Sequence, residues 1–223
     1  MISLTNADYA YLLTREYSPM QRGSAVSRLE QVIPTQMNVR QRELFEAIIG
    51  GKRARYNLDD KDRIAKEGLR GPFNPWMYAP DMGMLAQGLG EALRFEGTLT
   101  DRQREIAILC VAVHWQADYE WWAHAKIAAG YGVEASVIEA IHAGQVPRLS
   151  DESERLTFEF SQSVLRKHRV AQRLYADTAK ALGDESMVEL VTLLGYYVMI
   201  SMTLNVFEVA LPAGETSPFE GAE

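Results

Sequence analysis

Glu120 and His124 lie four residues apart in a stretch whose composition predicts a helix, so their side chains share one helical face. A carboxylate beside an imidazole raises the pKa of the imidazole and fixes its tautomer, which suits proton delivery near neutral pH. The same spacing is also common on exposed helices, where the pair contributes little. The pair therefore predicts either a general acid/base or a weak surface ion pair.

Glu105 is a second carboxylate with apolar neighbours. It shares a predicted helix face with Ile108, Leu109 and Ala112. A carboxylate on such a stripe is either stabilised by the dipole of a nearby helix start or buried with a raised pKa. Because Glu105 lies five residues beyond the predicted cap at Thr100, where the dipole effect fades, the buried interpretation gains weight.

Thiol, metal and nucleotide chemistry find little support in the sequence. Cys110 is the single cysteine, which excludes an internal disulfide and a Cys-x-x-Cys redox pair. The four histidines never occur as His-x-x-x-His, and no carboxylate triad accompanies a pair of them. No glycine-rich phosphate loop is present. We therefore expect no metal and no nucleotide cofactor.

The elements that position these residues are predicted to be helices throughout, because alternating strand patterns are essentially absent. Thr100 and Gln103 form a capping-box pattern, and Asn38 is a good helix cap. Residues 51–80 carry three X-Pro steps and are expected to form a shaped loop. The fold class is therefore all-α, with helices expected at about 38–50, 80–97, 100–113, 117–129, 134–142, 151–168, 171–182 and 184–209.

The last predicted helix is apolar on all sides. Eighteen uncharged residues separate Glu189 from Glu208, which meets the lower limit for a membrane span. The segment nevertheless contains several polar side chains, and acids stand at both ends where basic anchors would be expected. A helix that is apolar all round must be covered all round. We therefore expect a core helix of a homo-oligomer, without a membrane role.

Composition and charge bound the function class. With 47% hydrophobic and 24% charged residues, the chain has an ordinary globular composition. A net charge of −7 and a pI near 5.2 argue against nucleic acid or an anionic membrane as partner. The N-terminus lacks a basic start followed by an apolar run, so the cytoplasm is expected. We expect an N-terminal arm (1–36), loosely ordered, one helical domain (37–212) and a flexible tail (213–223).

A series of short motifs runs along residues 38 to 210 in a characteristic order and spacing. They are Gly71-Pro72-Phe73, Ala79-Pro80-Asp81, Leu93-Arg94-Phe95, Leu99-Thr100, Arg104-Glu105, Tyr119-Glu120-Trp121, His124, Ala128, Gly132-Val133, Glu189-Leu190-Val191, Gly195-Tyr196-Tyr197 and Leu204-Asn205. With these motifs the chain resembles the carboxymuconolactone decarboxylase family, the all-α group that also contains the alkylhydroperoxidase AhpD-like proteins. This resemblance implies an AhpD-like helical bundle assembled as a trimer or hexamer. The peroxidase branch of the family carries its Cys-x-x-Cys pair where this chain has Ala117 and Glu120, so a dithiol peroxidase activity is not expected.

The resemblance places Glu105, Glu120 and His124 on the proton-relay positions of the family. It implies a lyase that decarboxylates a small carboxylated lactone or a related aromatic catabolite. No cofactor is needed, because the carbonyl of the substrate itself takes up the electrons. His124 would be the general acid/base, Glu120 its orienting partner and Glu105 a second carboxyl. A hydrolase or isomerase of a lactone or enol, and a non-catalytic oligomeric binding protein, remain open.

Substrate binding is predicted less directly. A clamp for the substrate carboxylate would come from Arg53, Arg55 or Arg94, although each arginine is also explained as a solvated surface charge. Trp121 can stack on a flat ligand, but Trp122 beside it faces another way, so one of the two is expected in the core. Tyr196 and Tyr197 raise the same question as Trp121. The predicted substrate-binding residues are thus Arg94, Arg55, Trp121 and Tyr196.

Overall fold

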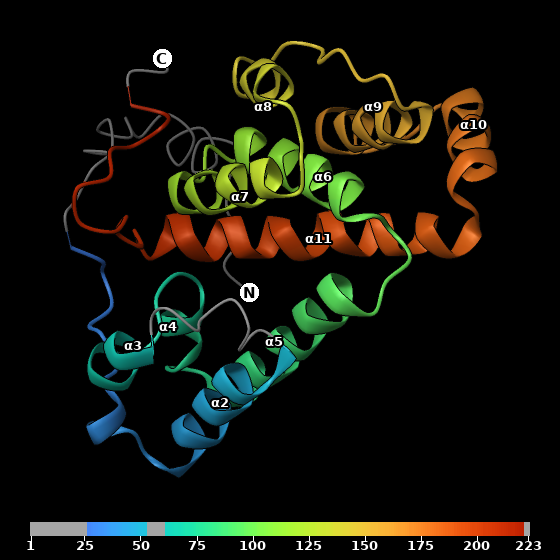
Figure 1. Ribbon diagram of the computed structural model, residues 1–223. Coiled ribbons are helices and arrows are strands. Elements are labelled where there is room, and N and C mark those ends of the chain that lie inside the picture. Colours follow the sequence, from blue (N-terminus) through green and yellow to red (C-terminus); the bar gives the residue numbers. More distant parts are fainter. Residues whose placement is uncertain (1–25, 53–60, 221–223) are drawn as a thin grey trace, which may run out of the picture.

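The computed structural model of the chain describes residues 26–52 and 61–220. Within these ranges the protein forms ten α-helices, one 3-10 turn (Pro34–Gln36) and no strand (Figure 1). The predicted all-α class is therefore confirmed. The helices are α2 (Val39–Gly50), α3 (Lys61–Glu67), α4 (Phe73–Trp76), α5 (Pro80–Phe95), α6 (Asp101–His114), α7 (Asp118–Gly130), α8 (Ala135–His142), α9 (Glu152–Lys167), α10 (Gln172–Leu182) and α11 (Asp184–Val206).

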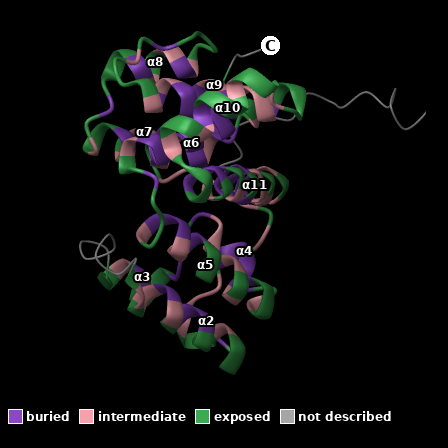
Figure 2. Cartoon of the chain, turned by 90° about the vertical axis from the view of Figure 1, so that its right-hand side faces the viewer, coloured by how far each residue is buried: buried purple, intermediate pink, exposed green. Residues whose placement is uncertain are grey.

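Helix α6 is the centre of the fold. It packs against α7, α8, α9 and α11, and ten of its fourteen residues are buried. In Figure 2 the buried residues, drawn in purple, gather around α6, whereas much of α2 is exposed. The start of α6 is fixed by the predicted capping box, in which Thr100 accepts from the backbone N–H of Gln103 and the Gln103 side chain accepts from the backbone N–H of Thr100. This cap sets the register of Glu105.

Helix α11 runs as one long rod beneath α6 and α7 in the view of Figure 1, with α2 and α5 on its other side. Glu189 of α11 holds the segment before α6, because its Oε2 accepts from Thr98 N at 2.6 Å, from Thr98 Oγ1 at 2.9 Å and from Leu99 N at 3.2 Å. A Cβ at Gly97 would overlap the same carboxylate, so a larger residue there would require the Glu189 side chain to move. This contact locks α6 against α11.

The apolar character of α11 is divided between two faces. One face is buried on α6 and α7, and half of its most apolar 18-residue window is buried. By length and composition α11 would also be able to cross a membrane, but this packing identifies it as the core helix of the bundle. The other face exposes four large apolar side chains, namely Val188, Val191, Met202 and Val206.

Residues 51–80 differ from the shaped loop that the proline pattern predicts. Two helices, α3 and α4, form within this segment. Pro72 is the N-cap residue of α4 and Pro75 lies in its first turn, where the backbone N–H that proline lacks would have no helical partner. The prolines are therefore compatible with a helix start, and the prediction of a loop was wrong at these two helices.

The predicted arm and tail are tied down where the structure describes them. Arg28 N donates to Phe207 O at 2.9 Å, and Val32 N donates to Asn74 Oδ1 at 2.9 Å. In the tail, Phe219 is 5% exposed and its ring stacks on His142 with centroids 5.1 Å apart. We expected a loosely ordered arm and a flexible tail. Residues 1–25 of the arm lie outside the described residues; residues 26–36 pair backbone groups with the helices while staying partly or fully exposed, and in the tail Phe219 buries its ring.

Candidate active site

The two carboxylates and the imidazole singled out by the sequence meet in one buried cluster. His124 Nδ1 lies 2.6 Å from Glu105 Oε2, and His124 Nε2 lies 3.0 Å from Glu120 Oε1. The side chains of His124, Glu120 and Glu105 are 9%, 4% and 0% exposed. The buried interpretation of Glu105 is therefore confirmed, and the weak surface pair is excluded for Glu120 and His124.

The backbone brings these residues together through the short break between α6 and α7. Gln116 adopts a φ of 46°, which lets the chain reverse within three residues. Asn205 of α11 braces the break, because its Nδ2 donates to Trp115 O at 2.8 Å. Helices α6 and α7 consequently pack side by side, and Glu105 meets a histidine 19 residues further along the chain.

The two contacts of the imidazole differ in kind. The contact between His124 Nδ1 and Glu105 Oε2 is a short hydrogen bond. The contact between His124 Nε2 and Glu120 Oε1 has the distance of an ion pair, yet Glu120 Oε1 has no aligned hydrogen bond to any described residue. Glu105 therefore fixes the ring through Nδ1, and the proton on Nε2 is not held by an aligned acceptor.

The surroundings of the imidazole favour its charged form. Burial lowers the pKa of His124, but the negative charges of Glu105 and Glu120 raise it by more, and the Tyr197 side chain adds to the rise. The pKa of His124 therefore lies well above its usual value. A buried imidazolium beside a carboxylate is a proton donor that also has a path for regaining its proton.

Arg94 completes the cluster from the end of α5. Its Nη1 lies 3.6 Å from Glu105 Oε1 and donates to the Tyr197 hydroxyl at 3.2 Å. The side chain is 7% exposed. The sequence predicted a clamp for a substrate carboxylate, whereas the structure turns this guanidinium toward two residues of the protein. With two cations and two carboxylates, the cluster is balanced in charge.

Tyr197 is the residue that sequence reasoning missed. Its ring stands edge-on to the His124 ring, with centroids 5.2 Å apart and planes at 83°. The sequence raised the same question for both tyrosines, and the prediction chose Tyr196. The available signal was the buried stripe of α11, in which Leu193, Tyr197 and Ile200 recur at helical spacing.

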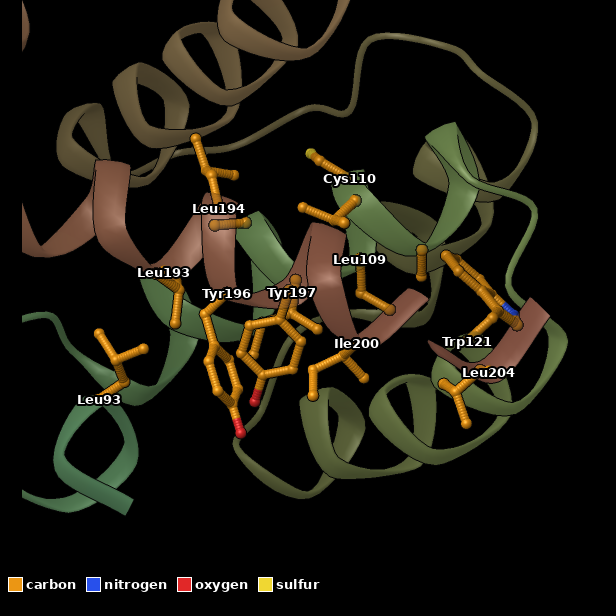
Figure 3. Close-up of a cluster of buried hydrophobic side chains, with 14 of the residues drawn as sticks. Leu93, Leu109, Cys110, Trp121, Leu193, Leu194, Tyr196, Tyr197, Ile200 and Leu204 are labelled. Carbon is orange, nitrogen blue, oxygen red and sulfur yellow. The ribbon is translucent and has the colours of Figure 1, made fainter. Parts of the chain in front are cut away.

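Tyr196 is buried next to Tyr197, at a centroid distance of 5.3 Å. The hydroxyls of both tyrosines point to the same side of α11 (Figure 3). Tyr196, predicted as a substrate-binding residue, is therefore placed at the border of the cluster.

Two further predicted substrate-binding residues are not brought to the cluster. The Trp121 ring packs on His142 and Phe219, at centroid distances of 4.7 and 6.0 Å, and Figure 3 shows it well apart from the tyrosines. Trp121 follows Glu120 directly, and one residue turns a helix by about 100°, so it faces the core between α7 and the tail. Arg55, together with the neighbouring Arg53, lies outside the described residues.

Cys110 lies on the side of α6 that faces α9 and is fully buried. Burial raises the pKa of this thiol to about 12, so it stays protonated at neutral pH and is no nucleophile. Within residues 26–52 and 61–220, no group of three or more His, Cys, Asp or Glu side chains is arranged to hold a metal ion.

The chain was compared with protein families, curated proteins and solved structures, and solved structures share its fold. No protein-family model matches the chain, and no curated protein matches its sequence. Among solved structures, an uncharacterized peroxidase-related protein from Ralstonia eutropha JMP134 with an alkylhydroperoxidase AhpD core aligns at a TM-score of 0.67 and 15% identity, over 86% of this chain and 95% of that one.

Two further solved structures extend this likeness. An uncharacterized peroxidase-related protein from Silicibacter sp. TM1040 aligns at a TM-score of 0.65 and 12% identity, over 87% of this chain and 96% of that one. The debrominase Bmp8 in its apo form aligns at 0.63 and 12% identity, over 86% and 94%. At these identities the likeness concerns the fold, and the protein has an AhpD-like all-α fold.

Proposed function

We propose that this protein is a cofactor-independent, carboxymuconolactone decarboxylase-like lyase that acts on a small carboxylated lactone or a related aromatic catabolite in the cytoplasm. The observation that carries the proposal is the geometry around His124. Glu105 orients the buried ring through Nδ1, and Nε2 lies 3.0 Å from Glu120 Oε1 without an aligned hydrogen bond. The two carboxylates raise the pKa of His124, which favours a protonated ring. A proton donor held in this way suits the last step of a decarboxylation.

The comparisons support an enzyme in general terms. One protein of the same fold is named a debrominase and two are named peroxidase-related, so chemistry has been associated with this bundle. In this chain the only thiol is buried and protonated. Proton transfer by Glu105, Glu120 and His124 is therefore the chemistry that the described residues favour.

The reaction balances with one proton. The bond between the ring carbon and the carboxylate carbon breaks, CO₂ leaves, and the electron pair of that bond moves into the conjugated carbonyl to form a dienolate. His124 then transfers its Nε2 proton to carbon and becomes neutral. A proton from solvent, passed by Glu120, restores the imidazolium. The net change is uptake of one proton and release of CO₂, with no external oxidant or reductant.

The geometry shifts two roles within this mechanism. The sequence assigned the orienting role to Glu120, but the hydrogen bond that orients the ring comes from Glu105. We therefore assign Glu105 as the positioning residue and Glu120 as the proton partner at Nε2. The unpaired Oε1 of Glu120 also favours a second candidate, an isomerase that removes a proton from a lactone or enol with Glu120 and returns it with His124.

We also propose that the protein is a homo-oligomer, a trimer or hexamer, assembled through the exposed face of α11. Four apolar side chains lie exposed along this face of the core helix, namely Val188, Val191, Met202 and Val206. Replacing Val191 with Asp places a charge in the proposed interface. Light scattering after gel filtration should then show a smaller assembly, and an unchanged mass would argue against this interface.

The function is tested by incubating the full chain with a carboxymuconolactone while measuring CO₂ release and the product by NMR. We expect turnover by the native chain and a loss of at least about 100-fold in a His124→Gln, Glu105→Gln double variant. This pair keeps two amides in place of the imidazolium and carboxylate, so the charge of the cluster remains balanced. Tyr175→Phe, on the exposed side of α10, is the matched control and should keep full activity.

Each outcome separates the candidates. Product without CO₂ would support the isomerase, and no conversion by the native chain would contradict the decarboxylase. Undiminished turnover by the folded double variant would show that the cluster is not the active site.

A further inference from the structure

The Tyr197 hydroxyl lies in the cluster, and no hydrogen bond donated by this hydroxyl is found within the described residues. Its oxygen accepts a hydrogen bond from Arg94 Nη1 at 3.2 Å. The structure records no described residue that accepts the proton of this hydroxyl. The side chain is 4% exposed, so bulk water has little access to the phenol. The Tyr197 O–H is thus a buried donor turned toward a charged site.

Arg94 changes what this donor can do. A cation that donates to a phenol oxygen draws electron density from the O–H bond and stabilises negative charge that develops nearby. The guanidinium is itself held by Glu105, whose Oε1 lies 3.6 Å away. Because Glu105 also orients His124, one carboxylate positions both the proton donor to carbon and the cation behind the phenol.

A decarboxylation needs two donors with different targets. The electron pair of the broken bond arrives at the carbonyl oxygen, which requires a donor prepared in advance to stabilise it. The proton must then go to carbon, and in the proposed mechanism it comes from His124. Tyr197 stands edge-on to the His124 ring at 5.2 Å between centroids, so the two donors belong to side chains that lie next to each other.

We propose that Tyr197 is the hydrogen-bond donor to the enolate oxygen of the substrate and that Arg94 is a positioning residue that acts through Tyr197 and Glu105. This inference rests on the proposed function and deepens it. It names the complementary group of the ligand, a conjugated carbonyl or enolate oxygen. It also replaces the sequence-based role of Arg94 as a clamp for the substrate carboxylate.

A Tyr197→Phe variant removes the hydroxyl and keeps the ring against His124. A purely structural tyrosine would tolerate this change without loss of ligand affinity. The probe is 4-nitrophenolate, a planar oxyanion whose absorbance shifts on binding, and 4-nitroanisole is the matched neutral ligand. The full chain is titrated with each compound, and Tyr175→Phe serves as the control for loss of an exposed tyrosine.

We expect the native chain and Tyr175→Phe to bind 4-nitrophenolate equally and Tyr197→Phe to bind it at least about tenfold more weakly, with 4-nitroanisole affinity unchanged in all three. Arg94→Lys should weaken 4-nitrophenolate binding less than Arg94→Met, because lysine keeps the charge behind the phenol. Equal affinity of the native chain and Tyr197→Phe, or failure of the native chain to bind the phenolate, would overturn the proposal.

Turnover supplies the second measurement. In the carboxymuconolactone assay, Tyr197→Phe should lower kcat about 100-fold and change KM by less than about threefold, because the donor acts on charge that forms only during the reaction. An unchanged kcat would contradict the role of Tyr197. The binding titration requires no turnover, so a native chain that binds 4-nitrophenolate through Tyr197 but releases no CO₂ would reject the decarboxylase and leave the oxyanion site.

Discussion

Two charged clusters start three residues apart on α6 and differ in almost every other respect. Arg102 donates from Nε and Nη2 to the two oxygens of Glu154 at 2.6 and 3.0 Å, and also from Nη2 to Glu134 at 3.0 Å. Its Nη1 donates to Gly132 O. The Arg102 side chain is 28% exposed. Every nitrogen of this arginine is therefore in use, at the protein surface.

The Glu105 cluster is buried and incompletely bonded. Oε1 of Glu105 and Oε1 of Glu120 have no hydrogen-bond partner among the described residues, although both carboxylates are nearly or fully inaccessible. Buried polar groups are almost always satisfied, so such exceptions call for an explanation. Arg102 therefore joins α6, α9 and the segment before α8 as a fully bonded structural contact. The Glu105 cluster instead leaves two buried carboxylate oxygens without a hydrogen bond, which agrees with the proposed active site.

The largest difference between the two clusters is expected when one charge is removed from each. His124→Gln leaves two buried carboxylates facing one cation, which should cost about 3–5 kcal/mol of unfolding free energy and abolish turnover. Arg102→Gln loses hydrogen bonds at a partly exposed site and should cost about 1–3 kcal/mol with turnover kept. Urea unfolding and the CO₂ assay measure both. A larger loss of activity in Arg102→Gln than in His124→Gln would reverse the assignment.

A second variant separates charge from chemistry within the buried cluster. Adding Glu105→Gln to His124→Gln restores the charge balance, so the double variant should regain about 1–3 kcal/mol over His124→Gln. Activity should remain absent, because no proton donor is present. The measurement is a double-mutant cycle on urea unfolding. If the two substitutions add independently, Glu105 and His124 are not coupled and the ion pair is not the source of the instability.

The sequence predicted most of the helical architecture because that information is local. Caps at Asn38 and Thr100, glycine stops and 3.6-residue periodicity each involve neighbouring residues, and both predicted caps form. Helix α4 was missed because proline was taken as a breaker, although it fits the start of a helix. Helix α3 is a short segment with one buried residue, Ile64, so its apolar periodicity gave little signal. The docking of Phe219 also escaped, since its partners on α7 and α8 lie far away in the chain.

The site was predictable only in part, for the same reason. Glu120 and His124 are one turn apart, so spacing alone placed them together. Glu105 depended on its apolar neighbours, and its meeting with His124 required the break between α6 and α7. Tyr197 and the orientation of Arg94 depend on packing between α5, α6 and α11, which no spacing in one helix encodes.

The two clusters should also differ in how they make the free energy of unfolding depend on pH. The pKa of His124 is raised in the folded protein above its unfolded value of about 6.5, so the protonated imidazole stabilises the fold fully below that pH. This contribution should be lost as pH rises from there through the folded pKa. Unfolding free energies measured from pH 6 to 9 should therefore decline in the native chain and in Arg102→Gln. The double variant at His124 and Glu105 should lack this decline; an identical slope would assign it to other groups.

The smallest effect is expected on the opposite side of α6, where Cys110 faces α9. With a thiol pKa of about 12, about one part in 10⁴ of Cys110 is thiolate at pH 8, against about a quarter for an ordinary cysteine. Iodoacetamide should therefore modify the folded chain at least about 1,000-fold more slowly than the urea-unfolded chain. Cys110→Ala should cost only about 1–2 kcal/mol and leave CO₂ release unchanged, because this side of α6 is packing alone. Rapid alkylation of the folded chain, or loss of turnover in Cys110→Ala with stability retained, would show that both sides of α6 carry chemistry.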